Sequence, residues 1–144
     1  MAFMNSLDIS GSGLTAQKYR MSIVAQNLAN ADTTRTEAGG PYRRKLVVLS
    51  EREGARDFAG ALSAASEQAR GVRVEEVLDD EDDFRVEYDP THPDANEEGY
   101  VQLPNVNTVE EMVDIMSAAR LFEANVTAFN AMKGMAQKAL EIGK

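Results

Sequence analysis

The only histidine of the chain lies in a short segment rich in carboxylates. His92 stands between Asp89 and Asp94 in the run Asp-Pro-Thr-His-Pro-Asp. An imidazole with two carboxylates could hold a divalent metal for catalysis, although sites of this kind usually draw on more histidines. Two prolines among acids are equally typical of a tight surface turn. We predict the turn, and a small metal-dependent enzyme centred on these residues remains an alternative.

A second place where a cation could bind is the acidic run Asp79–Asp83. It lacks the alternating ligands and central glycine of an EF-hand loop, so we predict a solvated turn instead of a calcium site. The basic cluster Arg43-Arg44-Lys45 is typical of a strand edge guarded by charge. It could also meet the acidic run of a neighbouring copy, because the two charges are complementary.

The remaining catalytic and cofactor motifs are missing from the sequence. There is no cysteine, which excludes disulfides, thiolate metal sites and cysteine nucleophiles. Gly11-Ser12-Gly13 is not followed by the Gly-Lys-Ser/Thr of a phosphate-binding loop. No serine stands in the Gly-x-Ser-x-Gly pattern of an esterase nucleophile elbow. We therefore predict no catalytic residues, no metal, no cofactor and no enzyme activity.

Charge and hydropathy limit the partners of this 144-residue, single-domain chain. The formal net charge of −9 disfavours nucleic acid and anionic membrane surfaces. No stretch approaches the roughly 20 apolar residues of a membrane helix, so we expect no direct membrane insertion. The first residues lack a basic and an apolar region, which predicts the absence of a cleaved signal peptide.

The N-terminal part predicts a helix with one narrow apolar stripe. Leu7, Leu14, Met21 and Leu28 recur every seven residues, as in a coiled coil. Gly11 and Gly13 weaken the first turns, so we predict a start near Ser12 or Leu14 and an end near Asn30.

The middle of the chain carries the turn and strand signals. Gly39-Gly40-Pro41 predicts a turn. Short strands are predicted at Leu46–Leu49, around Val72 and Val74, as a half-buried strand through Phe84, Val86 and Tyr88, and at Tyr100–Leu103. For residues 51–70, rich in Ala, Ser, Gly and charge, we predict a mobile loop or a weak helix.

The C-terminal part predicts the longest helix. Thr108 and Glu111 form a capping box at its start. Two apolar lines follow at heptad spacing: Ile115, Phe122, Phe129 and Ala136 in one, and Met112, Ala119, Val126 and Leu140 in the other, the latter interrupted by Lys133. Such a helix would run about 50 Å, too long for a small domain to cover. We expect it to meet the first helix and other copies, and the free monomer to be weakly folded.

These patterns together predict a mainly α protein with a small β part. The terminal helices pack as a coiled-coil hairpin, and the β-rich middle lies at one end. The expected parts are an N-terminal axial helix over 1–33, a β-rich segment over 34–107 with a mobile loop at about 51–70, and a C-terminal axial helix over 108–144.

Several segments resemble the bacterial flagellar axial proteins, the rod, hook and hook-associated subunits. Leu14-Thr15-Ala16-Gln17 and Asn27-Leu28-Ala29-Asn30-Ala31-Asp32-Thr33-Thr34 resemble their N-terminal signature. The stretches 39–44, 88–90, 99–101 and 104–106 are similar to the proximal-rod branch, and 109–113, 119–120 and 123–126 to its closing helix. The similarity covers roughly two thirds of the chain, and the segment 51–70 is outside it.

The resemblance implies a structural subunit of the flagellar basal-body proximal rod, the drive shaft that transmits torque from rotor to hook. Its partners would be copies of itself, other proximal and distal rod subunits, the membrane-embedded ring with its adaptor, and the flagellar type III export apparatus. Its location would be the periplasm-spanning rod of the basal body, reached without a cleaved signal peptide. Non-closing contacts between subunits would generate a helical tube.

The resemblance also assigns roles to residues. Helix packing and assembly fall to Leu7, Leu14, Met21, Leu28, Met112, Ile115, Ala119, Phe122, Val126, Phe129, Ala136 and Leu140. Asn27, Asn30 and Thr33 would satisfy backbone groups where the first helix turns into the middle segment. The alternative function is a coiled-coil adaptor or secreted interaction protein unrelated to the rod.

Overall fold

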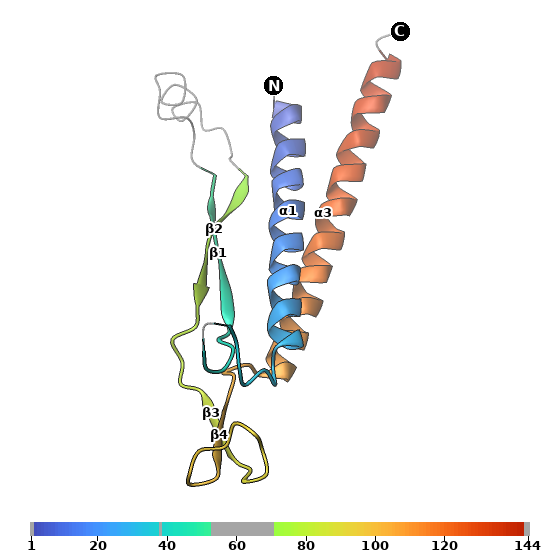
Figure 1. Ribbon diagram of the computed structural model, residues 1–144. Helices are drawn as coiled ribbons and strands as arrows, with labels where there is room; N and C mark the ends of the chain where they lie inside the picture. Colours follow the sequence, from blue (N-terminus) through green and yellow to red (C-terminus); the bar gives the residue numbers. More distant parts are fainter. Residues whose placement is uncertain (1, 38, 53–70, 143–144) are drawn as a thin grey trace, which may run out of the picture. The chain divides into compact units, whose positions relative to one another are not determined.

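The computed structural model contains two long helices and four short strands (Figure 1). Helix α1 spans Ala2–Ala29 and helix α3 spans Thr108–Ile142. The strands are β1 (Lys45–Glu51), β2 (Val72–Asp79), β3 (Arg85–Tyr88) and β4 (Tyr100–Leu103). The structure describes residues 2–37, 39–52 and 71–142. The predicted mainly α protein with a small β part is confirmed.

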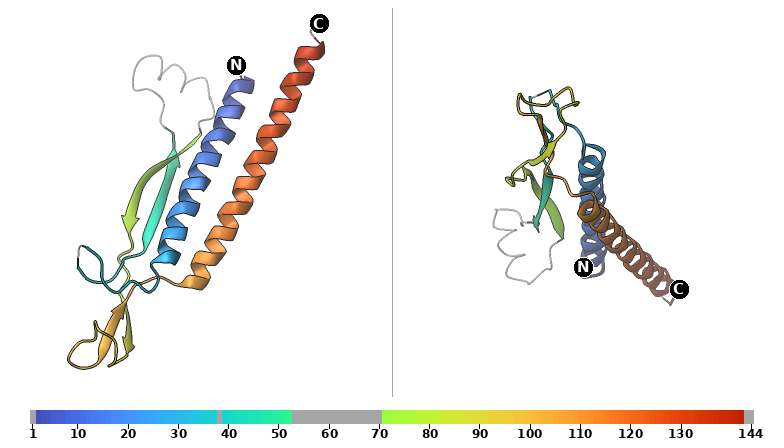
Figure 2. Two further views of the ribbon diagram at one scale, coloured as in Figure 1. Left: turned by 45° about the vertical axis from the view of Figure 1, so that its right-hand side comes forward. Right: turned by 90° about the horizontal axis from the view of Figure 1, so that it is seen from below.

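The chain divides into two compact units. The first combines Met1–Tyr19, Leu49–Glu75 and Ala118–Lys144, and the second combines Arg20–Val48 and Glu76–Ser117. Both helices and the strands β1 and β2 contribute residues to each unit, and Figure 2 traces each helix without a break. The predicted mobile loop falls almost entirely on residues outside the described part.

Helix α1 begins earlier than its glycines suggest. The predicted start near Ser12 or Leu14 is wrong, because the helix runs from Ala2 through Gly11 and Gly13. A Cβ at Gly13 would lie 3.2 Å from the Asn125 side chain of α3, tighter than ordinary packing. The missing side chain therefore permits a close approach within the first unit, which offsets the low helix propensity of glycine. The end at Ala29 agrees with the predicted stop near Asn30.

The start of β2 is attached to α1 within the first unit. The Ser12 hydroxyl donates to the Ile9 carbonyl at 2.7 Å and accepts the Val72 N–H at 3.0 Å. Gly71, just before the strand, is buried against this serine, and a Cβ there would come within 2.8 Å of the Ser12 Cβ. Only glycine therefore fits between the strand and the helix.

The strands form two separate two-stranded sheets, β1–β2 and β3–β4. The first is antiparallel, because the Arg52 N–H bonds the Gly71 carbonyl while the Asp80 N–H bonds the Arg44 carbonyl. In the second, also antiparallel, Val86 faces Gln102 and Tyr88 faces Tyr100. All four predicted strand regions are thus present.

The two faces of the β3–β4 sheet differ in exposure. Val101 is buried, whereas Val86 and Tyr88 are more than half exposed and Tyr100 is 44% exposed. The prediction of a half-buried strand through Val86 and Tyr88 is therefore wrong. The alternation is real, but the apolar side of β3 points away from the core that Val101 reaches.

Helix α3 starts at a different cap from the predicted one. The Asn107 side chain accepts the Val109 N–H at 3.1 Å, and the Glu111 N–H bonds the Asn107 carbonyl. Asn107 is therefore the N-cap, and the predicted capping box of Thr108 and Glu111 is wrong. The Glu111 carboxylate is withdrawn into the protein instead, where it meets Arg44 and Asn27.

Within the second unit, the end of α1 lies beside the start of α3 (Figure 1). Arg20 pairs with Asp114 at 3.2 Å, and Asn27 donates to Glu111 at 3.1 Å. The later residue of α1 contacts the earlier residue of α3, so these segments of the two helices are antiparallel. The second unit also contains a small buried apolar core, formed by Ala31, Tyr42 and Val106.

Candidate functional site

Asn27, near the end of α1, is the centre of a buried polar cluster in the second unit. Its side chain is 1% exposed. The amide oxygen accepts the Lys45 N–H and the Tyr42 hydroxyl, each at 2.9 Å. The amide nitrogen donates to the Lys45 carbonyl at 2.9 Å and to Glu111. All four hydrogen-bonding positions of the amide are used, so Asn27 fastens the first residue of β1 to α1.

Glu111 supplies the charge of this cluster. Its side chain is 0% exposed, and one carboxylate oxygen accepts from Nε of Arg44 at 2.6 Å while the other accepts from Asn27. Arg44 also pairs with Asp80 at 3.3 Å. Because a buried carboxylate is tolerated only when paired and hydrogen-bonded, these contacts determine which groups must meet here.

The protonation states of the cluster follow from its contacts. Burial lowers the pKa of the Arg44 guanidinium, but the hydrogen bonds and charges of Glu111 and Asp80 outweigh it and raise the pKa above its ordinary value. The pKa of Tyr42 is raised by burial and then by the nearby charges of Asp79 and Glu111. Arg44 therefore stays charged and Tyr42 stays a neutral donor, which is the combination the hydrogen bonds require.

Asn30 and Thr33 lie at the turn that follows α1. The Asn30 amide donates to the Gln26 carbonyl at 2.8 Å, and the Thr33 hydroxyl bonds the Asn30 side chain at 3.2 Å. The Thr33 carbonyl accepts the Tyr42 N–H at 2.9 Å, which closes the loop over 33–42. Gly39 and Gly40, with φ of 86° and 79°, form the predicted turn within it.

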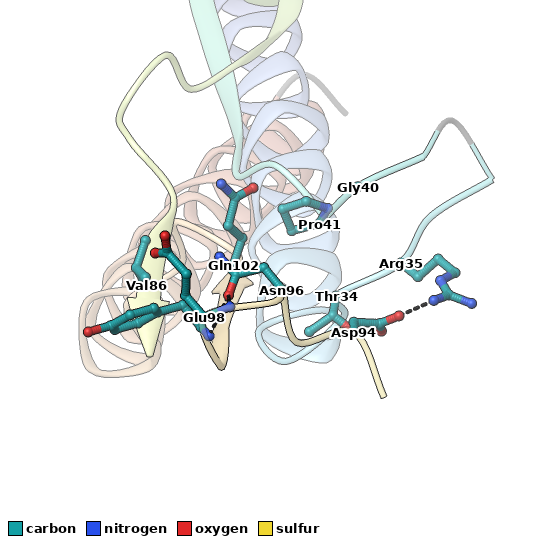
Figure 3. Close-up of a pocket in the computed structure, with 10 residues that line it drawn as sticks. Thr34, Arg35, Gly40, Pro41, Val86, Asp94, Asn96, Glu98 and Gln102 are labelled. Atoms are coloured by element: carbon teal, nitrogen blue, oxygen red, sulfur yellow. Dashed lines mark hydrogen bonds and ion pairs between the residues drawn. The ribbon is translucent and has the colours of Figure 1, made fainter. Parts of the chain in front are cut away.

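A hollow of about 630 Å³ lies between this loop and the β3–β4 hairpin (Figure 3). Thr34 and Arg35 on one side hold the Asp94 carboxylate, the threonine at 2.8 Å. These contacts, the Thr34 hydrogen bond first, keep the pKa of Asp94 below its usual range. Val86, Glu98, Tyr100 and Gln102 line the other side. The hollow is open and mostly polar at its rim, unlike a closed catalytic pocket.

His92 and its acidic neighbours form a hydrogen-bonded turn. The Asp89 carboxylate accepts the backbone N–H and the hydroxyl of Thr91, which hold its pKa below the usual value. Nδ1 of His92 accepts the Asp94 N–H at 3.1 Å. In the described part of the chain, no group of three or more His, Cys, Asp or Glu side chains is arranged to hold a metal ion. Asp89 and His92 are thus engaged in turn contacts, and the Asp94 carboxylate is held by Thr34 and Arg35.

The basic cluster and the acidic run meet within one chain. Nη1 of Arg43 donates to the carbonyls of Asp80 and Asp82 at 2.7 and 3.2 Å, and its guanidinium lies 4.4 Å from the centre of the Phe84 ring. The Asn105 side chain connects the Arg44 N–H with the same carbonyls. The proposal that this cluster meets the acidic run of a neighbouring copy is replaced by these intrachain contacts.

The residues predicted for helix packing differ in exposure. Those that are half buried are Leu7, Leu14, Met21, Leu28, Ile115, Ala119, Phe122, Val126, Phe129 and Ala136. Met112 and Leu140 are more than half exposed. The inward side of α3 also includes Glu111 and Ala118, both fully buried, which the heptad lines do not contain.

Sequence reasoning missed a second apolar stripe on α3. Val109, Met112, Val113 and Met116, all within the second unit, are each more than half exposed. Their spacing of three and four residues places them along one side of the helix. We call this set the outer stripe. Met112 belongs to a predicted heptad line, but Val109, Val113 and Met116 do not, although the i, i+3, i+4, i+7 spacing of the four residues could have revealed the stripe.

Two family sequence profiles match the segments that carry the buried cluster. The "Flagella basal body rod protein" profile matches residues 7–35, which include Asn27, and the "Flagellar basal body rod FlgEFG protein C-terminal" profile matches residues 97–142, which include Glu111. The chain is 51% identical to the flagellar basal-body rod protein FlgC of Bacillus subtilis over the full length of both. It is 40% identical to the FlgC proteins of Borreliella burgdorferi, with 99% of this chain and 98% of that one covered, and of Escherichia coli O6:H1, over the full length of both.

The chain belongs to the FlgC family of flagellar basal-body rod proteins. Membership of the FlgC family makes it a structural subunit of the rod, as the resemblance implies, and disfavours the unrelated adaptor. FlgC is a structural rod-protein family and not an enzyme family. Among the described residues, no helix has the length and apolar character needed to cross a membrane.

Proposed function

We propose that this FlgC-family chain assembles helically with copies of itself and with other rod subunits, and so forms part of the shaft that transmits torque from rotor to hook. The terminal segments 1–33 and 108–144 would form a coiled-coil hairpin in the axial core, and residues 34–107 would form its β-rich part. Delivery would use the flagellar type III export apparatus without a cleaved signal peptide. The membrane-embedded ring and its adaptor would be neighbours of the assembled rod.

The observation that carries this proposal is that α3 is apolar on both sides. Inward, Ile115 and Ala118 are half buried and fully buried, respectively. Outward, the outer stripe leaves valine and methionine side chains in water, where they gain nothing from the hydrophobic effect. A helix that is apolar on both sides is normally covered on both sides. Because rod proteins assemble, we expect a neighbouring rod subunit to bury the outer stripe.

The buried cluster supports the hairpin at its closed end. Asn27 of α1 and Glu111 of α3 bond each other, and both contact the segment Arg44–Lys45. A wrong register of the helices would leave the buried Glu111 carboxylate without partners, at a cost of roughly several kcal/mol, and the buried Asn27 amide with unmade hydrogen bonds. The cluster therefore favours one register, which a subunit repeated in a regular array needs.

The test is a pair of substitutions on α3. Val113→Asp places a charge in the outer stripe, and Ser117→Asp places the same charge on an exposed position just beside it. In a flagellated host that lacks its own copy of this protein, we expect Val113→Asp to be expressed but to abolish rods and swimming. Ser117→Asp should retain both. Normal rods with Val113→Asp would overturn the role of the outer stripe.

A matching test addresses the inward side. Phe122→Asp and Val126→Asp replace half-buried side chains of α3 within the first unit. Each should also prevent assembly, but through loss of helical structure in the isolated chain, which circular dichroism detects. Val113→Asp should leave that signal unchanged. Different circular dichroism results for the two sides would therefore separate hairpin packing from contact between subunits.

A further inference from the structure

The net negative charge of this protein comes from one segment. Residues 79–98 hold ten Asp or Glu and a single Arg, a surplus of nine negative charges that equals the formal net charge of the chain. The rest of the sequence holds fourteen acidic and fourteen basic residues. We call residues 79–98 the acidic segment. It comprises Asp79 at the end of β2, strand β3 and the turns on both sides of β3, all within the second unit.

Within the described ranges 2–37, 39–52 and 71–142, ion pairs neutralise little of this charge. Among the described residues, Asp80 pairs with Arg44 and Asp94 pairs with Arg35. The other carboxylates are mostly exposed: Asp79, Glu81, Asp82, Asp83, Glu87, Glu97 and Glu98. A concentration of one sign attracts an oppositely charged partner and raises its rate of association.

The acidic segment also frames an apolar face. Val86, Tyr88 and Tyr100 lie on one side of the β3–β4 hairpin, because Val86 is opposite Gln102 and Tyr88 is opposite Tyr100 in the register. The two tyrosine rings meet edge to face, with centres 5.3 Å apart. We call these three residues the aromatic face. Two residues of this face, Val86 and Tyr100, also line the hollow of Figure 3, together with Glu98.

The same chain shows how this segment receives an arginine. The Arg43 guanidinium stacks on Phe84, at the start of the acidic segment, while it donates to the carbonyls of Asp80 and Asp82. A cation over an aromatic ring with oxygen acceptors beside it is a favourable arrangement. The aromatic face and the adjoining hollow offer comparable groups to a cation from outside, two tyrosine rings from the face and the Glu98 carboxylate from the hollow.

We propose that the aromatic face and the adjoining hollow bind an Arg- or Lys-bearing segment of a partner protein other than a second copy of this chain. A second copy is a poor match, because outside the acidic segment its charges balance and its cluster Arg43–Arg44 is already bound in its own chain. Tyrosine is enriched among the residues that contribute most to binding in protein interfaces, and the rim around such residues is polar, as it is here. This inference goes beyond assembly through the outer stripe and uses a different surface.

The test uses the full chain and two short synthetic peptides, one alternating Arg with Ala and one alternating Glu with Ala, in titration calorimetry. The Arg peptide should bind saturably and weaken as salt rises, and the Glu peptide should not bind. Glu98→Gln and Tyr88→Ser should each weaken the Arg peptide about three- to fivefold. Glu123→Gln and Tyr19→Ser, exposed positions of α3 and α1, should leave it unchanged.

Several results would overturn the proposal. If the Arg peptide binds Glu98→Gln as tightly as the parent chain, the attraction is diffuse and there is no site. The same conclusion follows if the control variants weaken peptide binding as much as the site variants do. Absence of binding at low salt would exclude the site. Self-association that disappears in Glu98→Gln without peptide, measured by sedimentation, would make a second copy the occupant. Glu98→Gln keeps the shape of the side chain, so the test does not depend on whether Tyr88→Ser folds.

Discussion

The carboxylate of Glu111, in the first turns of α3, lies 2.6 Å from Nε of Arg44, the residue before β1. These residues are 67 positions apart in the chain, and the carboxylate is 0% exposed. A buried ion pair of this kind contributes little net stability compared with apolar groups, but removing one partner is costly. It therefore makes the fold sensitive to one particular pairing of distant segments.

Replacing Glu111 by alanine should lower the free energy of unfolding by about 3 kcal/mol, because Arg44 and Asn27 lose a buried partner. Urea denaturation followed by circular dichroism measures the loss. The matched control is Glu110→Ala, one residue away and exposed, which should change stability by less than about 0.5 kcal/mol. Equal effects of the two substitutions would contradict the role of the ion pair.

Gly71→Ala should destabilise the first unit, because the added methyl group would clash with Ser12, whose hydroxyl accepts the Val72 N–H. We expect a loss of about 1–3 kcal/mol from overpacking in thermal unfolding. The double variant Gly71→Ala with Ser12→Gly should recover part of the loss, because it vacates the space. If the serine is not the obstacle, the stability lost by the double variant will equal the sum of the losses of the two single variants.

Gly99→Ala and Gly40→Ala separate backbone strain from crowding. Both glycines have positive φ, 83° and 79°, so each alanine incurs about 1–2 kcal/mol of left-handed strain. At Gly99 the new Cβ would also lie 2.9 Å from Cε2 of Tyr88, whereas Gly40 has open space. Gly99→Ala should therefore be the more destabilising of the two. Equal losses would show that Tyr88 moves away freely.

Acid should loosen the contact between Asp94 and the loop after α1. Because the pKa of Asp94 is lower in the folded chain than in the unfolded one, its contribution is present above the ordinary value of about 3.9 and is lost as the pH falls through the folded value. Thr34→Val removes the first cause of the shift, so the decline in stability below about pH 4 should become shallower. Thr36→Val, whose hydroxyl bonds the Gly40 carbonyl, is the control and should keep the slope.

Local patterns predicted most of the elements. The heptad spacing of Leu14, Met21 and Leu28 and the positive-φ glycines at 39 and 40 depend on residues close together in the chain, where helix and turn geometry are decided. The start of α1 was the exception. Gly11 and Gly13 disfavour a helix by propensity, but at Gly13 the close approach of Asn125, more than a hundred residues away, offsets that preference.

The sequence by itself therefore determined the mainly α class, the strand regions and the kinship with rod proteins, because periodicity and motifs are local properties. Only the tertiary structure decided that Glu111 is a buried partner of Arg44 instead of a helix cap, and that Arg43 and Arg44 meet the acidic run of their own chain. It also decided which side of α3 remains exposed at Val109 and Met116. The physical reason is that burial and charge pairing depend on which distant segments come together, and no spacing within one segment contains that information.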